Sequence, residues 1–269
     1  MILRGLEAAS KGMLALIDMN DNLANNIANV NTTGYKKSSL TFKDIIEADV
    51  YNRKGNLVEG ENKYIGQVSL GSETLQLTHD FSQGCLNKTD APLDLAIEGD
   101  GFFKVQDADG KISYTRNGSF TQNNQGFLIT KEGDYVLDTE NRRINLAPEE
   151  FALRSDKTLI VGEDGTIELN SGGARFDMQK IGVFDFSNKD DLFEIGNARF
   201  VPKTPAINPE LRSEKYSIQQ GYIELSNTNI IKEMINSINT TRNYESLGKY
   251  VRENSSLLST AITLGRIRQ

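Results

Sequence analysis

Residues 1–30 carry the clearest hydrophobic pattern in the chain. Apolar side chains recur there at alternating spacings of four and three residues, with one polar interruption at Asn20. This spacing predicts a long amphipathic helix with a seam of the coiled-coil type. The seam positions are Ile2, Leu6, Ala9, Met13, Leu16, Asn20, Leu23, Ile27 and Val30. A run of Asn and Thr followed by Gly34 predicts the end of this helix.

A second amphipathic segment lies at the other end of the chain, from about residue 227 to 267. Asn227, Thr228 or Asn229 can cap its first turn, where Glu233 suits the positive end of the helix dipole. Isolated helices are marginally stable, so we expect the two helices to pack against each other and against helices of other copies. The apolar positions of this looser seam include Ile231, Met234, Ile235, Ile238, Leu247, Val251, Leu258, Ala261 and Leu264.

Between these helices the chain breaks into short strand-like runs separated by Gly, Asn and Asp. The pairs at 109–110, 117–118 and 164–165 are turn signals, as is the segment 99–101. We therefore predict an α+β fold in which the terminal helices pair as a coiled-coil-like core domain beside a central, mainly-β domain. The predicted parts are an N-terminal core helix (1–33), an extended or β connector (34–79), the β domain (80–220) and a C-terminal core helix (221–269).

Composition and charge exclude several classes of function. No apolar run approaches the ~18 residues that a membrane helix needs. A formal net charge of -7 argues against binding of nucleic acid, which requires a basic face. The single cysteine, Cys85, excludes an internal disulfide and a cysteine-clustered metal site. The first residues lack the continuous apolar segment of a secretory signal peptide, so we expect any export to use another route.

Candidate catalytic and ligand-binding motifs fail in their spacing. His79, the only histidine, lies in neither a nucleophile elbow nor a metal-binding HExxH motif, and Cys85 has no basic neighbour that would activate it. The segment 107–110 resembles the opening of a calcium loop, but Arg116 stands where that loop needs Glu. The segment 99–101 lacks the third glycine of a dinucleotide fingerprint. We predict no enzymatic activity, no metal and no cofactor.

The end of the first helix is unusually rich in asparagine. An ordinary capped terminus explains the residues from Asn31 to Gly34 but not Asn22, Asn25 and Asn26, which lie further inside the helix. Asparagine has a weak helix propensity, yet its carboxamide offers both donors and acceptors. We interpret these residues as polar positions that set the register between subunits, where a purely apolar seam could slip.

Three segments resemble the bacterial flagellar rod and hook protein family. They are ANNIANVNTTGYKKSSLTF (24–42), LDLAIEGDGFFKV (93–105) with YTRNGSF (114–120), and GYIELSNTNIIKEMINSI (221–238). They lie in the family's order and together span nearly the whole chain. The hook protein of the family is usually considerably longer, so the length favours a rod protein. Residues 34–46 and 79–94 favour the distal-rod type, with the proximal-rod type as the alternative.

The resemblance implies a structural subunit that polymerises helically, with its paired terminal helices inside and its β domain outside. It places the subunit in the periplasm-spanning rod of the basal body, exported by the flagellar type III apparatus without a cleaved signal peptide. Its partners would be copies of itself, neighbouring rod and hook proteins and the bushing rings, with no nucleic acid.

We expect the assembly interface to use residues of the two helical seams. They are Leu6, Met13, Leu16, Asn20, Leu23, Asn26, Ile27, Asn29, Met234, Ile238, Val251 and Leu258. Two functions of other classes remain as alternatives. An extracellular binding module or adhesin could use the β region, and a cell-wall hydrolase could use a carboxylate pair such as Asp190 and Asp191.

Overall fold

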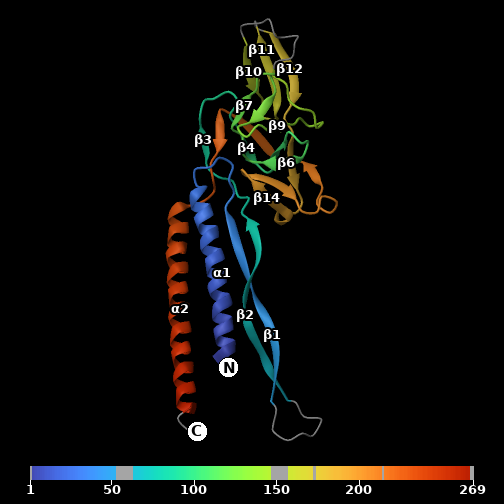
Figure 1. Ribbon diagram of the computed structural model, residues 1–269. Coiled ribbons are helices and arrows are strands. Elements are labelled where there is room, and N and C mark those ends of the chain that lie inside the picture. The colour runs from blue at the N-terminus through green and yellow to red at the C-terminus, as the bar shows by residue number, and fades with distance from the viewer. Residues whose placement is uncertain (1, 53–62, 147–156, 172–173, 214, 267–269) are drawn as a thin grey trace. The chain divides into compact units, whose positions relative to one another are not determined.

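The computed structural model describes residues 2–52, 63–146, 157–171, 174–213 and 215–266 (Figure 1). The chain forms two compact units. The helix unit comprises Met1–Ala28, Ser38–Thr78 and Asn229–Gln269. The β unit comprises Asn29–Lys37 and His79–Thr228.

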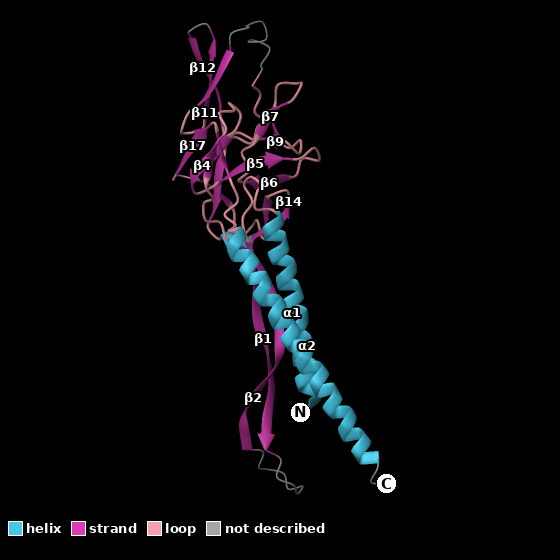
Figure 2. Ribbon diagram, turned by 90° about the vertical axis from the view of Figure 1, so that its left-hand side faces the viewer, coloured by secondary structure: helices cyan, strands magenta, loops and turns pink. Residues whose placement is uncertain are grey.

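The helix unit contains helix α1 (Ile2–Ala28), helix α2 (Ile230–Arg266) and strands β1 (Ser38–Asn52) and β2 (Lys63–His79), which pair with each other; the last residue of β2 belongs to the β unit. The helices pack side by side and antiparallel (Figures 1 and 2). The predicted helix at each end of the chain and the packing between the two helices are confirmed. Helix α1 ends at Ala28, five residues before the predicted end of the N-terminal helix at residue 33. Gly34 lies in the turn that follows, with φ of 69°.

Small residues on α1 allow α2 to approach closely. A Cβ atom added at Gly5 would lie 3.2 Å from the hydroxyl oxygen of Tyr250, and one at Gly12 would lie 3.5 Å from a methyl carbon of Leu247. The start of α2 is capped as predicted, because the side-chain oxygen of Asn229 accepts a hydrogen bond from the backbone N–H of Lys232 at 3.1 Å.

The β unit is built from short antiparallel strands. In the part of the chain that the structure describes, its main sheet has the order β14-β15-β6-β5-β9-β8-β7, and β13 pairs with both β5 and β16. Strands β10, β11 and β12 form a separate sheet, and the pairs β4–β17 and β3–β18 complete the unit. The strands are β3 (Leu86–Lys88), β4 (Leu95–Gly99), β5 (Phe102–Gln106), β6 (Ile112–Thr115), β7 (Phe120–Gln122), β8 (Leu128–Thr130), β9 (Tyr135–Val136), β10 (Lys157–Val161), β11 (Thr166–Ser171), β12 (Ala174–Lys180), β13 (Val183–Phe186), β14 (Leu192–Gly196), β15 (Arg199–Pro202), β16 (Glu210–Arg212), β17 (Tyr216–Gln220) and β18 (Tyr222–Glu224), with a short 3-10 helix at Lys189–Asp191.

The core of the β unit covers both faces of strand β5. Successive strand residues point to opposite faces, and Phe102 and Phe103 are both fully buried. Phe103 belongs to an aliphatic cluster with Ile97 and Val183, whereas Phe102 belongs to an aromatic cluster with Phe200. The predicted turn at 99–101 precedes this strand and uses positive φ angles at both of its glycines. The predicted α+β class, with a mostly-β region between the two helices, is therefore confirmed.

Candidate assembly interface

A buried polar network joins α1, β1 and α2 inside the helix unit. Asn26 is fully buried, and its side-chain N–H donates to the backbone oxygen of Ser38 at 2.8 Å. The carboxamide oxygen of Asn26 accepts from the Ser38 backbone N–H at 3.0 Å. The side-chain nitrogen of Asn26 also lies 3.4 Å from the carboxylate of the fully buried Glu233. A single asparagine on α1 therefore hydrogen-bonds both backbone polar groups of the first residue of β1 and faces the first turn of α2.

Other asparagines of α1 also have partners within the chain. Asn22 donates to the hydroxyl of Ser38 at 2.7 Å, and Asn20 accepts from the hydroxyl of Ser237 on α2 at 2.9 Å. From the sequence alone, the internal asparagines are expected to make contacts between subunits. The structure gives Asn20, Asn22 and Asn26 hydrogen bonds that hold the helix unit itself together.

Helix α2 directs its most apolar stripe away from α1. The residues of α2 that are buried or half-buried lie on one helical face, and more than half of them are polar: Glu233, Asn236, Ser237, Thr240, Leu247, Gly248, Val251, Asn254 and Leu258. Four large apolar residues between positions 231 and 238 lie on another face and are 48–66% exposed. We call them the apolar stripe, and they are Ile231, Met234, Ile235 and Ile238.

A small pocket lies between the helices, at the level of Leu16 on α1 and Tyr244 on α2. Its volume is about 200 Å³. We call it the socket, and it is lined by Leu16, Ile17, Asn20, Thr240, Thr241 and Tyr244. Exposed apolar residues on α1, Leu14 at 60% and Ile17 at 42%, add to the apolar surface of this unit.

The structure places the predicted interface residues in three environments. Leu23 and Asn26 are buried in the helix unit, whereas Met234 and Ile238 are exposed. Asn29 lies just past α1, in the β unit, where its side-chain oxygen accepts from the Thr32 hydroxyl at 3.1 Å. The half-buried members are Leu6, Met13, Leu16, Asn20, Ile27, Val251 and Leu258.

Some exposed apolar residues were not among the predicted interface residues. Ile231 and Ile235 on α2, and Leu14 and Ile17 on α1, are all exposed. The signal for the α2 residues was in the sequence, because positions 231, 234, 235 and 238 have the spacing of one helical stripe. The pattern could not say that this stripe points away from α1.

A buried ion cluster lies within the β unit. The ammonium group of Lys36 donates to the Glu224 carboxylate at 2.6 Å and to the backbone oxygen of Ser82 at 2.7 Å. The Arg116 guanidinium lies 3.5 Å from the other carboxylate oxygen of Glu224 and donates to the backbone oxygen of Gly99 at 2.8 Å. The side chains of Lys36, Arg116 and Glu224 are at most 2% exposed.

Burial governs the ionisation of this cluster. Desolvation lowers the pKa of both Lys36 and Arg116, and the nearby Glu224 carboxylate partly offsets this effect. Each of the three residues comes from a different one of the segments 24–42, 114–120 and 221–238. The cluster therefore explains why charged residues stand inside three otherwise separate motifs, a link that no local sequence pattern indicates.

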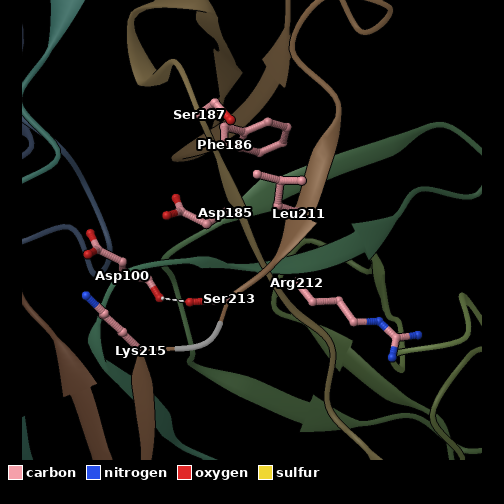
Figure 3. Close-up of a pocket in the computed structure, with 8 residues that line it drawn as sticks. All are labelled: Asp100, Asp185, Phe186, Ser187, Leu211, Arg212, Ser213 and Lys215. Atoms are coloured by element: carbon pink, nitrogen blue, oxygen red, sulfur yellow. Dashed lines mark hydrogen bonds between the residues drawn. The ribbon is translucent and has the colours of Figure 1, made fainter.

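The β unit also has a shallow charged pocket of about 230 Å³ (Figure 3). Asp100 and Asp185 line it, and Lys189 lies 2.6 Å from the first and 3.5 Å from the second. The hydroxyl of Ser213 donates to the backbone oxygen of Asp100 at 2.8 Å (Figure 3). Because Lys189 lowers the pKa of Asp100, this carboxyl is an anion at neutral pH and is unsuited to act as a general acid.

The residues that the structure describes contain neither a metal-binding cluster nor a helix that could span a membrane. Among them, no group of three or more His, Cys, Asp or Glu side chains is arranged to hold a metal ion. None of the described helices is long and apolar enough to cross a membrane.

His79 is buried in the β unit beside the aromatic cluster. Its ring packs edge-to-face on Phe200 with centroids 5.2 Å apart, and its Nε2 atom lies 3.8 Å from the Glu194 carboxylate. Burial lowers the pKa of His79 below the ordinary value of 6.5. The site thus suits a neutral imidazole that packs as an aromatic ring.

This burial predicts that the β unit loses stability on acidification. Just below pH 6.5 the unfolded chain binds a proton at His79 that the folded chain does not, so the free energy of unfolding falls as the pH decreases through this window. We expect His79→Gln to flatten this part of the pH dependence in thermal denaturation. Burial also raises the pKa of Glu194, and this shift increases the free energy of unfolding as the pH decreases. Glu194 is present in both proteins, so it does not cause a difference between them. An equal pH dependence in both would contradict the assignment.

Together these features describe a long antiparallel helix pair with exposed apolar side chains, and a β unit in which the buried charged groups of Lys36, Arg116 and Glu224 pair with one another. Comparison with known protein families gives three matches. The model described as "Flagella basal body rod protein" matches residues 21–36, "Flagellar hook protein FlgE/F/G D1 domain" matches 96–169, and "Flagellar basal body rod FlgEFG protein C-terminal" matches 219–264.

Relatives cover nearly the whole chain. The flagellar basal-body rod protein FlgG of Bacillus subtilis is 30% identical over 98% of this chain and 100% of its own length. FlgG of Borreliella burgdorferi is 32% identical with the same coverage, and FlgF of Mesorhizobium japonicum is 30% identical over 97% of both chains. The chain belongs to the flagellar basal-body rod protein family. It is a structural, non-enzymatic component of the flagellar rod, and FlgG is favoured over FlgF.

Proposed function

We propose that the chain polymerises helically through its helix unit into the distal part of the rod and transmits torque along it. The observation that carries this proposal is the exposure of the apolar stripe on α2. Scattered exposed apolar residues are ordinary, but a contiguous stripe indicates an interaction surface. Burial of one such side chain in a neighbouring subunit would contribute about 1.5–3 kcal/mol, and a polymer repeats the contact many times.

The spacing of the α2 residues that face α1 supports a coiled-coil-like core. Heptad spacing keeps one face of a helix on its partner over many turns. In the proposed polymer, the half-buried seam residues become fully covered by helices of neighbouring copies. These residues include Leu6, Met13, Leu16, Ile27, Val251 and Leu258, joined by the exposed Met234 and Ile238.

The proposed setting follows from the family. The subunit would span the periplasm within the basal body, contact neighbouring rod and hook proteins, and turn inside the bushing rings. Export by the flagellar type III apparatus without a cleaved signal peptide would deliver it. Long helices with exposed apolar faces gain further stability from assembly, which suits passage through a narrow channel in an unfolded form before assembly.

The proposal predicts that a charge on the apolar stripe blocks assembly without unfolding the chain. Ile235 is 53% exposed, so Ile235→Asp removes little internal packing but places a carboxylate in the proposed contact. We expect loss of rod assembly and of swimming in cells that depend on the variant, with an unchanged melting temperature of the purified chain. The matched control is Asn243→Asp, which adds the same charge at an exposed position of α2 outside the stripe. Normal swimming of the Ile235→Asp strain would contradict the proposal.

A further inference from the structure

We propose that the socket between α1 and α2 accepts an apolar side chain from the apolar stripe of a second copy of this chain. The inference rests on the proposed function, since it names the contact through which copies polymerise. The donor segment is the first turns of α2, and the acceptor is the pocket that Leu16 and Tyr244 line.

The size of the socket selects a side chain as its occupant. Pockets for small-molecule ligands usually measure about 300–1,000 Å³, and the socket at about 200 Å³ is smaller. Its lining combines the apolar Leu16 and Ile17 with Asn20, two threonines and a tyrosine, and it contains no charged side chain. Such a lining suits one branched apolar side chain, and the stripe offers three isoleucines and a methionine.

Charge next to the two surfaces is complementary. The exposed residues that follow directly after socket residues are three acids, Asp18, Asp21 and Glu245, and one cation, Arg242, so the surroundings of the socket are net acidic. On α2, Lys232 is exposed and stands three residues before Ile235, so it neighbours the stripe on the helix surface. Lys232 is the only cation between residues 228 and 241. A stripe entering the socket of another copy would therefore bring a cation towards an acidic helix surface.

Donor and acceptor are different surfaces of the same helix unit. Each copy can therefore donate its stripe to one neighbour and accept the stripe of another. A heterologous contact of this kind continues from copy to copy and generates a helical filament unless its rotation closes a ring. The socket thus gives the proposed polymer a direction.

Disulfide trapping between two single-cysteine chains tests this contact. One full-length chain carries Ile235→Cys in the stripe and the other carries Thr241→Cys in the socket, both with Cys85→Ser because Cys85 is exposed. Under mild oxidation at concentrations where the chain sediments as polymer, we expect a 1:1 cross-linked dimer only in the mixture. A chain with both cysteines is expected to give a ladder of higher oligomers. Asn243→Cys replaces Ile235→Cys as the matched control and is expected to give no cross-link.

The outcomes separate this inference from the proposed function. Polymer that sediments but gives no cross-link in the mixture overturns the socket contact and leaves helical assembly standing. Dimers formed by the Ile235→Cys chain alone also overturn it, because they show that two stripes face each other. If the wild-type chain forms no polymer at any concentration tested, self-assembly through the helix unit fails, and the socket contact fails with it.

Discussion

Glu224→Gln is expected to lower the free energy of unfolding of the β unit by about 3–5 kcal/mol, the range for removing one partner of a buried ion pair. The variant leaves the ammonium of Lys36 and the guanidinium of Arg116 buried without their carboxylate. The Glu224 carboxylate also accepts from the backbone N–H of Gly84 at 2.8 Å, so the change weakens a further, partly buried contact. Urea denaturation followed by circular dichroism measures the loss.

Two further variants make this prediction specific. Lys36→Met in the Glu224→Gln background removes one of the uncompensated cations, so the double variant should lose less stability than the sum of the two single variants. Glu140→Gln is the control, since the side chains of Glu140 and Arg142 are 62% and 61% exposed and a surface pair contributes at most about 1 kcal/mol. Equal losses for Glu224→Gln and Glu140→Gln would contradict the importance of the buried cluster.

Asn26→Leu is expected to destabilise the helix unit by about 3 kcal/mol or more. The substitution leaves the buried backbone N–H and oxygen of Ser38 without their side-chain partner, and each such group costs about 1–3 kcal/mol. It also removes the polar neighbour of the buried Glu233 carboxylate. Hydrogen exchange should show faster exchange of the Ser38 amide and of the first turns of α2.

The control for this variant is a leucine at an exposed position of the same helix. Ala24→Leu adds apolar surface near Asn26 without removing a hydrogen bond, and Ala24 is exposed. We expect unchanged exchange at Ser38 in this chain. If Asn26→Leu left exchange and melting temperature as they are in the wild type, the network would not be what holds α1 to β1 and α2.

Much of the fold could be predicted from local patterns. The heptad spacing identified α1, and the cap at Asn229 fixed the start of α2 to within a few residues. Turn signals at 109–110 and 164–165 lie between paired strands, where the glycines adopt positive φ. These features depend on neighbours close in sequence, so one sequence was enough to find them.

Contacts between distant residues could not be predicted in the same way. The partners Lys36 and Glu224 are 188 residues apart, and nothing local indicates that Arg116 joins them. Helix amphipathicity likewise showed that Met234 and Ile238 share a stripe, but it could not tell whether the stripe faces α1 or lies exposed. The face of α2 that packs on α1 is set by the polar contacts of Glu233 and Ser237, so the stripe on another face stays exposed.

Electron cryo-microscopy of basal bodies purified from cells that carry a tagged copy of this chain tests the central claim most directly. We expect the tagged chain to form part of the axial rod in its distal region, with α1 and α2 of every copy packed among helices of neighbouring copies. Density in the proximal rod with the same helix packing would correct the position within the rod. Absence of the chain from the axis, or helices that contact no other copy, would contradict assembly through the helix unit.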